Sequence, residues 1–171
     1  VVGIMEGYSG LINNNFIQME SHSVSNIIQR GGTILRSARC EEIKTKQGME
    51  KAYNNLLNAD IDALIVIGGD GTFRGAHILC EKYNFPVIGI PGTIDNDLFG
   101  VHHSLGYDTA LNTVIQAVDK IRDTADSHNR LFFVEVMGRD AGFIALNSGL
   151  ASGAEAILIP ETKTHIQDLI N

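Results

Sequence analysis

The sequence is poor in several residue types that mark particular classes of protein. Among its 171 residues are no tryptophan, 3 prolines and 2 cysteines. Cys40 and Cys80 lack the spacing of a metal site, so we interpret them as reduced thiols. The longest apolar runs, such as residues 63–67, are too short to span a bilayer, and no charged segment leads into an apolar one as in a signal peptide. We therefore expect a cytoplasmic protein with no membrane partner.

Basic residues are also scarce. The chain has 13 Lys and Arg against 20 Asp and Glu, which gives a net charge of −7. No Lys/Arg cluster resembles the footprint of a nucleic-acid-binding surface, so no nucleic-acid partner is expected. Hydrophobic residues make up 44% of the chain and 18 residues are glycine, a composition typical of a soluble globular α/β protein.

Short apolar runs rich in Val and Ile recur along the chain and predict buried parallel strands. They lie at residues 1–5, 63–67, 86–90, 131–136 and 156–159, with a shorter one at 33–35. Helix-like segments lie between them, at residues 23–29, 48–58, 72–83, 108–126 and 143–151. Asp108 is the expected N-cap of the clearest of these helices. The alternation predicts an α/β fold with doubly wound, mainly parallel sheets in three layers and with ligands beyond the carboxyl ends of the strands.

Both ends of the sequence read as the interior of an element. "VVGIM" opens the chain as a strand without an initiating Met, and "THIQDLIN" closes it like the first turns of an amphipathic helix. We therefore expect these 171 residues to be part of a longer protein.

The first motif is "IVIGGDGTF", residues 65–73, in which a buried strand runs through glycines into a helix. Glycines let the backbone approach a ligand closely, and the N-terminus of a helix favours a phosphate. Asp70 in such a turn is a candidate Mg²⁺ ligand. The alternative is a tight strand-to-helix turn in which Asp70 or Thr72 caps the helix.

The second motif is "PGTIDND", residues 91–97, which also follows a buried strand. One of its carboxylates, Asp95 or Asp97, can take a proton from an attacking hydroxyl while the other helps to hold a metal. Thr93 can donate to a phosphoryl oxygen. The alternative is a surface turn rich in Asp and Asn.

Arginines follow two further runs. Arg36 and Arg39 belong to "RSARCEE", residues 36–42. Arg130 precedes the predicted strand 131–136, and Arg139 follows it in "MGRDAG". An arginine at these places can neutralise a transferring phosphoryl group, although a solvated surface role is the alternative. The six histidines form no ligand pattern.

Together, GGDGT, PGTIDND, SAR and MGRxxG, in this order and spacing, resemble the 6-phosphofructokinases of the bacterial ATP-dependent type. The resemblance covers essentially the whole chain. It implies two α/β lobes with a substrate cleft between them and a homotetramer. Residues 1–106 would belong to the ATP-binding lobe, without its first strand and Gly-rich loop, and residues 107–171 would begin the sugar-phosphate lobe.

The activity that the resemblance implies is phosphoryl transfer from MgATP to the 1-hydroxyl of D-fructose 6-phosphate. The implied catalytic residues are Asp95 as general base, with Arg39, Thr93 and Arg139. Those implied for ATP are Arg39, Cys40, Gly69, Asp70, Gly71 and Thr72, with Asp70 and Asp97 for Mg²⁺. Those implied for the sugar phosphate are Thr93, Ile94, Asp95, Met137, Gly138 and Arg139, with Arg130 reaching a neighbouring subunit. Those implied for an allosteric nucleotide or a phosphoenolpyruvate-type effector are Arg122, Gly153, Ala154 and Glu155.

Three alternatives stay open. The diphosphate-dependent branch characteristically has Asp in place of Gly71 and Lys in place of Gly92, and NAD or lipid kinases share GGDGT but not PGTIDND. A regulatory homologue with a degenerate site is disfavoured by the presence of Asp70, Asp95 and both catalytic arginines. Since the resemblance places further ligands outside these residues, we expect the isolated 171-residue chain to be inactive.

Overall fold

The computed structural model describes residues 1–164 and 167 and divides the chain into two compact units. The first unit contains residues 1–66 and 71–89, and the second contains residues 67–70 and those from 90 onward. Each unit is described on its own. The lobe boundary predicted at residue 106 stays a prediction about the longer protein.

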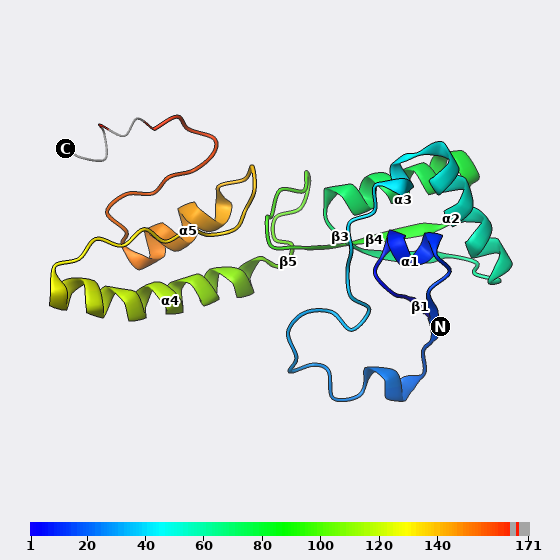
Figure 1. Cartoon of the computed structure of the whole chain (residues 1–171), viewed down its shortest axis with the longest axis horizontal. Helices are drawn as coiled ribbons and strands as arrows, with labels where there is room; N and C mark the ends of the chain where they lie inside the picture. The colour runs from blue at the N-terminus through cyan, green and yellow to red at the C-terminus, as the bar shows by residue number, and fades with distance from the viewer. Residues whose placement is uncertain (165–166, 168–171) are drawn as a thin grey trace. The chain divides into compact units, whose positions relative to one another are not determined.

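The first unit carries the N-terminal elements (Figure 1). In chain order these are β1 (Val2–Ile4), α1 (Tyr8–Ile12), β2 (Phe16–Gln18), the 3₁₀ turns η1 (Ser21–Val24) and η2 (Glu42–Lys44), α2 (Lys46–Asn58), most of β3 (Leu64–Gly68), most of α3 (Asp70–Tyr83) and the start of β4 (Val87–Thr93). β1 and β2 pair antiparallel with Gly3 opposite Ile17. Thr45 begins α2 because its side chain accepts a hydrogen bond from the Gly48 N–H at 2.9 Å.

The hydrophobic core of this unit lies between its helices and one face of β3. Leu11 of α1, Leu56 of α2 and Leu79 of α3 are fully buried there. Leu64 and Val66 of β3 point into the same cluster, whereas Ile65 and Ile67 are each 64% exposed. The alternation is the ordinary period of a strand, with one face covered in this chain and the other open.

The second sheet has the strand order β3-β4-β5, where β5 is Leu105–Gly106. β4 and β5 are parallel, with Gly92 opposite Leu105. The second unit continues with α4 (Tyr107–His128) and α5 (Phe143–Ser152), which pack side by side (Figure 1). The predicted α/β class is confirmed, and the four longer helices fall at or near the predicted ranges.

Three predicted strands are wrong. Residues 131–136 and 156–159 have no ladder partner among the described residues, and a strand needs such a partner. Ile157 and Ile159 instead pack beside Gly149 and Gly142 of the α5 region. Residues 33–35 belong to a turn closed by the Arg36 N–H and the Thr33 carbonyl.

Two helix predictions are wrong as well. The helix predicted at 23–29 is reduced to η1, because Asn26 has a φ of 56°, which an α-helix does not accept. The N-cap of α4 is Gly106 rather than Asp108, which lies in the first turn of that helix. Three short elements were not predicted from the sequence: α1, β2 and β5, whose lengths are only 5, 3 and 2 residues. The helix predicted at the C-terminal end falls largely outside the described residues.

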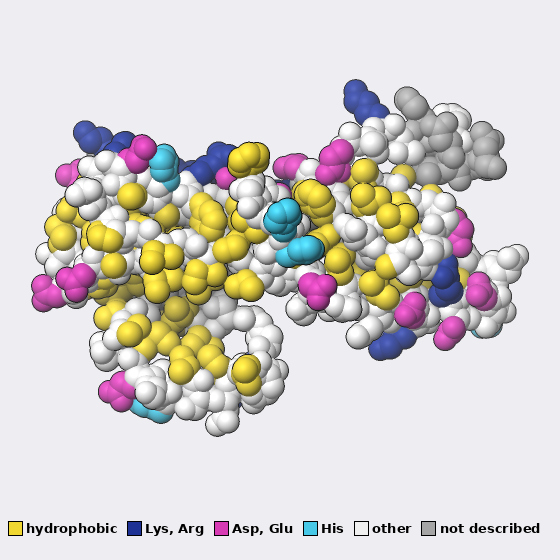
Figure 2. Space-filling view, turned by 180° about the vertical axis from the view of Figure 1, so that it is seen from behind, with side chains coloured by type: hydrophobic (Ala, Val, Ile, Leu, Met, Phe, Trp, Pro, Cys, Tyr) yellow, Lys and Arg dark blue, Asp and Glu magenta, His cyan; other side chains and the backbone are white. Residues whose placement is uncertain are grey.

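Hydrophobic side chains remain on the surface of the described chain, and Figure 2 shows them in several groups on one face. Large examples are Ile65, Ile67, Ile88, Leu131 and Phe133, all more than 60% exposed. Within residues 1–164 and 167, none of the helices combines the length and the apolar character needed to cross a membrane.

Candidate functional site

The GGDGT motif forms the predicted strand-turn-helix. β3 ends at Gly68 and α3 begins at Asp70, so the turn between them is a single residue, Gly69. A β-carbon built on Gly69 would lie 3.5 Å from the β-carbon of Thr93 at the end of β4. The second unit therefore places the glycine turn of the first motif close to Thr93 of the second motif.

Within the first unit, Tyr8 holds the beginning of α3. Its hydroxyl donates a 2.6 Å hydrogen bond to the carbonyl of Thr72, and a β-carbon on Gly75 would lie only 2.7 Å from its ring. Gly75 is therefore the residue that lets the ring approach the helix. Burial raises the pKa of Tyr8 to about 12. Sequence reasoning missed this contact, because Tyr8 and Thr72 are 64 residues apart.

The PGTIDND loop leaves β4 at Thr93, whose Oγ1 accepts a 3.2 Å hydrogen bond from the Asp95 N–H. Asp95 is half-buried and Asp97 is exposed. Among the described residues, neither carboxylate makes a hydrogen bond or an ion pair. Both are thus available to a ligand, as the predicted roles require.

A cavity of about 380 Å³ lies beside this loop in the second unit. Asp97 of the loop and Phe143 at the start of α5 both line it. The cavity is therefore lined both by the DND loop and by the helix that follows the MGRDAG segment. The remaining lining residues are Asn96, Leu98, Phe99, Val101 and His102.

The MGRDAG segment turns sharply before α5. Gly138 has a φ of 147°, and its carbonyl accepts a 2.9 Å hydrogen bond from the Ala141 N–H, a turn that favours glycine. The Glu161 carboxylate accepts from the Gly142 N–H at 2.7 Å, just ahead of α5. Within the described chain, the side chains of Arg130 and Arg139 form no hydrogen bond or ion pair. The structure does not bring either of them into contact with Asp95.

The remaining predicted ATP residues lie in the first unit. Arg39 is exposed, and its side chain has no hydrogen-bond or ion-pair partner among the residues that the structure describes. Cys40 is a free, half-buried thiol packed against the hydrophobic core. Gly71 has open space where a β-carbon would stand. These residues stay predictions for nucleotide binding.

The predicted effector residues do come together in the second unit. The Arg122 guanidinium donates hydrogen bonds to the carbonyls of Ser152 and Gly153 at the end of α5. Its Nη2 also lies 4.0 Å from Oε1 of Glu155. The contact spans about thirty residues of sequence, and what it binds stays a prediction.

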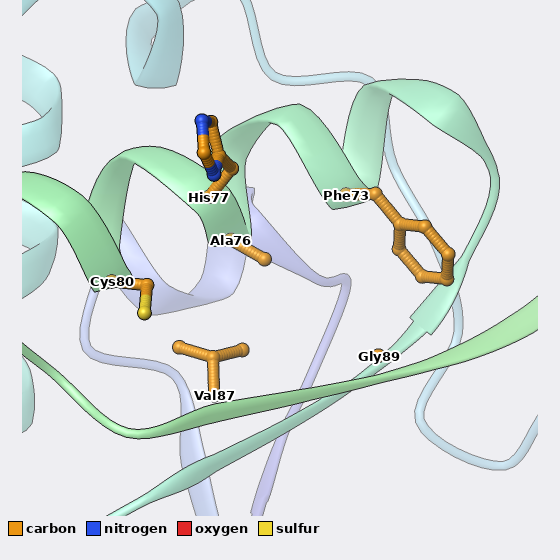
Figure 3. Close-up of a pocket in the computed structure, with 6 residues that line it drawn as sticks. All are labelled: Phe73, Ala76, His77, Cys80, Val87 and Gly89. Carbon is orange, nitrogen blue, oxygen red and sulfur yellow. The ribbon is translucent and has the colours of Figure 1, made fainter.

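A second cavity, of about 210 Å³, lies in the first unit between α3 and β4 (Figure 3). Phe73, Ala76 and Cys80 of α3 face Val87 and Gly89 of β4, while the His77 ring points away from the strand. The walls are mainly apolar and contain none of the predicted site residues. The cavity beside the DND loop is therefore the better candidate for the reactive site.

Comparison with known proteins decides the family. The sequence profile of the family described as Phosphofructokinase matches residues 1–171. The chain belongs to the phosphofructokinase family. It is 59% identical over 169 residues to ATP-dependent 6-phosphofructokinase 2 of Bacteroides thetaiotaomicron, covering 99% of this chain and 52% of that protein. It is 57% identical over 161 residues to ATP-dependent 6-phosphofructokinase 1 of Thermus thermophilus, covering 94% of this chain and 50% of that protein.

Solved structures agree with this assignment. The crystal structure of Pichia pastoris phosphofructokinase in the T-state superposes with a TM-score of 0.89 at 35% identity, over 98% of this chain and 20% of that one. The phosphofructokinase of Saccharomyces cerevisiae gives a TM-score of 0.83 at 35% identity, over 94% of this chain and 25% of that one. The chain spans about half the length of the curated relatives it matches.

Proposed function

We propose that this chain, as part of a longer protein, carries out phosphoryl transfer from MgATP to the 1-hydroxyl of D-fructose 6-phosphate. The product is fructose 1,6-bisphosphate, and the reaction is a step of glycolysis. The observation that carries the proposal is the closeness of Gly69 to Thr93, since it places a glycine turn suited to phosphate beside a carboxylate-bearing loop. The relatives named as ATP-dependent enzymes support it.

In this reaction the sugar oxygen bonds to the γ-phosphorus while the bond to ADP breaks. Asp95 takes the proton of the attacking hydroxyl, and Thr93 donates to the transferring group. Arg39 and Arg139 offset the charge that spreads over the phosphoryl oxygens. Met137, Gly138, Ile94 and, from a neighbouring subunit, Arg130 hold the sugar phosphate.

The residues present fit Mg²⁺. Among the described residues, no group of three or more His, Cys, Asp and Glu side chains is arranged to hold a metal. Kinase Mg²⁺ characteristically takes only one or two carboxylates and completes its shell with water and substrate phosphates. Asp70 and Asp97 would supply those carboxylates, and the ion would neutralise phosphate charge when bound.

The family resemblance supports further proposals about the whole protein. These are a cytoplasmic homotetramer, an ATP-binding lobe ending near residue 106, and an allosteric site for a nucleotide or a phosphoenolpyruvate-type effector. For that site we propose Arg122 with Gly153, Ala154 and Glu155, and the bonds that Arg122 makes to this stretch support the grouping.

The identity of the phosphoryl donor can be tested directly. The open space beside Gly71 leaves room for the α-phosphate of ATP, whereas a β-carbon on Gly92 would lie 2.8 Å from the Ile67 side chain, which would have to shift to admit a lysine. We expect the full-length protein to turn over MgATP and to use diphosphate poorly. Comparable or faster turnover with diphosphate would contradict this assignment.

A matched pair of variants sharpens the test. Gly71→Asp should depress ATP turnover, because its carboxylate would occupy the place of the α-phosphate and repel it. Gly31→Asp adds the same charge in the same unit, also where open space surrounds the glycine, and should leave turnover unchanged. Equal effects of the two substitutions would show that charge alone, and not donor space at Gly71, is responsible.

A further inference from the structure

We propose that Asn96 and Ser104 form a clasp that positions the loop carrying Asp95 and Asp97 for catalysis. The inference rests on the proposed function, because it gives both residues a part in proton removal from the sugar hydroxyl. Neither touches the reacting atoms in this assignment. Both are positioning residues that act through Asp95.

Asn96 uses both ends of its side-chain amide. Its Oδ1 accepts a hydrogen bond from the Ser104 N–H at 2.8 Å and lies 3.2 Å from the Ser104 Oγ. Its Nδ2 donates to the His102 carbonyl at 3.1 Å. These bonds close residues 96–104 into a ring, which restricts the loop more than an open surface turn would be restricted.

Ser104 connects the ring to the sheet. It is a buried polar residue, only 5% exposed, and its hydroxyl donates a 2.6 Å hydrogen bond to the carbonyl of Thr93. Thr93 is the last residue of β4, and the residue after Ser104 begins β5. The clasp thus fixes the loop against the two strand ends that flank it. A site held by rigid elements keeps its reactive groups within small tolerances.

The backbone at Asn96 explains why an amide stands between two acids. Asn96 has a φ of 53°, in the left-handed region that Asn accepts more readily than most residues. The amide satisfies the loop, while within the described chain neither flanking carboxylate is spent on a hydrogen bond or an ion pair. Holding the loop with a neutral side chain therefore leaves both charges free for substrate and metal.

Asn96→Gly in the full-length protein tests the clasp. Glycine keeps the left-handed backbone but removes the amide. We expect kcat with MgATP and fructose 6-phosphate to fall about 10- to 100-fold, as for a misplaced catalytic group, while the KM for fructose 6-phosphate changes far less. Asn84→Gly is the control. Asn84 also has a left-handed φ, 50°, but its side chain makes no hydrogen bond in the described chain, so kcat should not change.

A second variant tests whether the two residues act as one unit. Ser104→Ala removes the hydroxyl bond to Thr93 and should also lower kcat. The double variant should then lose little more than the worse single variant, because a broken clasp cannot be broken twice. Circular dichroism of every variant confirms that kcat is compared among folded proteins.

The outcomes separate this inference from the proposed function. If the wild-type protein fails to phosphorylate fructose 6-phosphate with ATP and with diphosphate, both the proposed function and the clasp are overturned. An active wild type with unchanged kcat in folded Asn96→Gly or Ser104→Ala overturns the clasp alone, and so does a double variant whose loss is the product of the two single losses. A kcat loss confined to the clasp variants, without added loss in the double variant, supports it.

Discussion

At the scale of single residues, the DND loop carries two carboxylates, Asp95 and Asp97, with a single residue between them. Like charges this close repel each other, and in the proposed site Mg²⁺ and the arginines offset that repulsion. Attack by a neutral hydroxyl on phosphorus requires removal of a proton as the new bond forms. We propose Asp95 as the base, as the family resemblance implies, and its half-buried position beside Thr93 supports this, whereas Asp97 is exposed and is proposed as a metal ligand.

Asp95→Ser tests this assignment. The substitution keeps a small polar side chain but removes the base, so we expect kcat of the full-length protein to fall about 10²–10⁴-fold. Affinity for fructose 6-phosphate should change far less. Steady-state kinetics with MgATP measures both quantities.

The control for this prediction is Asp119→Ser on α4, an exposed carboxylate without an ion pair among the described residues, which should retain full kcat. A general base contributes at least about 10²-fold to kcat. If Asp95→Ser kept more than about a tenth of the wild-type kcat, the loss would be too small for removal of the base, and the base would be a different group. Asp97 would then be the next candidate.

At the scale of elements, the sequence predicts what depends on local pattern. The helices at α2, α3, α4 and α5 follow from their periodicity, and the turn after β3 follows from its glycines. The strands predicted at 131–136 and 156–159 are wrong because an apolar run does not reveal whether a neighbouring strand is present to pair with it. For the same reason the sequence did not predict the Tyr8–Thr72 and Asn96–Ser104 hydrogen bonds, since no local pattern connects these residues.

The contact between α1 and α3 gives a prediction at this scale. Tyr8→Phe removes the hydrogen bond to the Thr72 carbonyl and should lower the free energy of unfolding by about 1 kcal/mol. Tyr83→Phe removes a hydroxyl that has no hydrogen bond in the described chain, and should unfold like the wild type at pH 8. Thermal unfolding of the full-length proteins measures both. Equal midpoints for all three would show that the Tyr8 bond contributes nothing.

The same residue makes stability depend on pH. Burial raises the pKa of Tyr8 to about 12 in the folded protein, whereas an unfolded tyrosine titrates near 10. Below pH 10 both states keep the proton and the contribution is constant. Above it the unfolded state loses the proton first, so stability falls as the pH rises toward 12, by at most about 3 kcal/mol. Tyr8→Phe should lack this part of the alkaline decline.

At the scale of the whole molecule, one face of the sheet is buried and the other is exposed. Leu64 and Val66 of β3 are buried, but Ile65 and Ile67 on the other face are 64% exposed and Ile88 of β4 is 66% exposed. Sheets with parallel strands are almost always covered on both faces. The chain also spans only about half the length of its curated relatives. The open face is therefore surface that the 171 residues alone do not bury.

These features predict the behaviour of a polypeptide made of the 171 residues alone. Full burial of an isoleucine is worth about 1.5–3 kcal/mol, and Ile65, Ile67 and Ile88 each forfeit part of it. Residues 131–136, which have no ladder partner among the described residues, offer backbone groups that favour association with other chains. We expect negligible phosphorylation of fructose 6-phosphate by this polypeptide, together with concentration-dependent association in size-exclusion chromatography. The full-length protein, measured beside it, should be active and should elute as one species. Turnover by the 171 residues close to that of the full-length protein would show that they already hold a complete site, and the open face of β3 would then need another explanation.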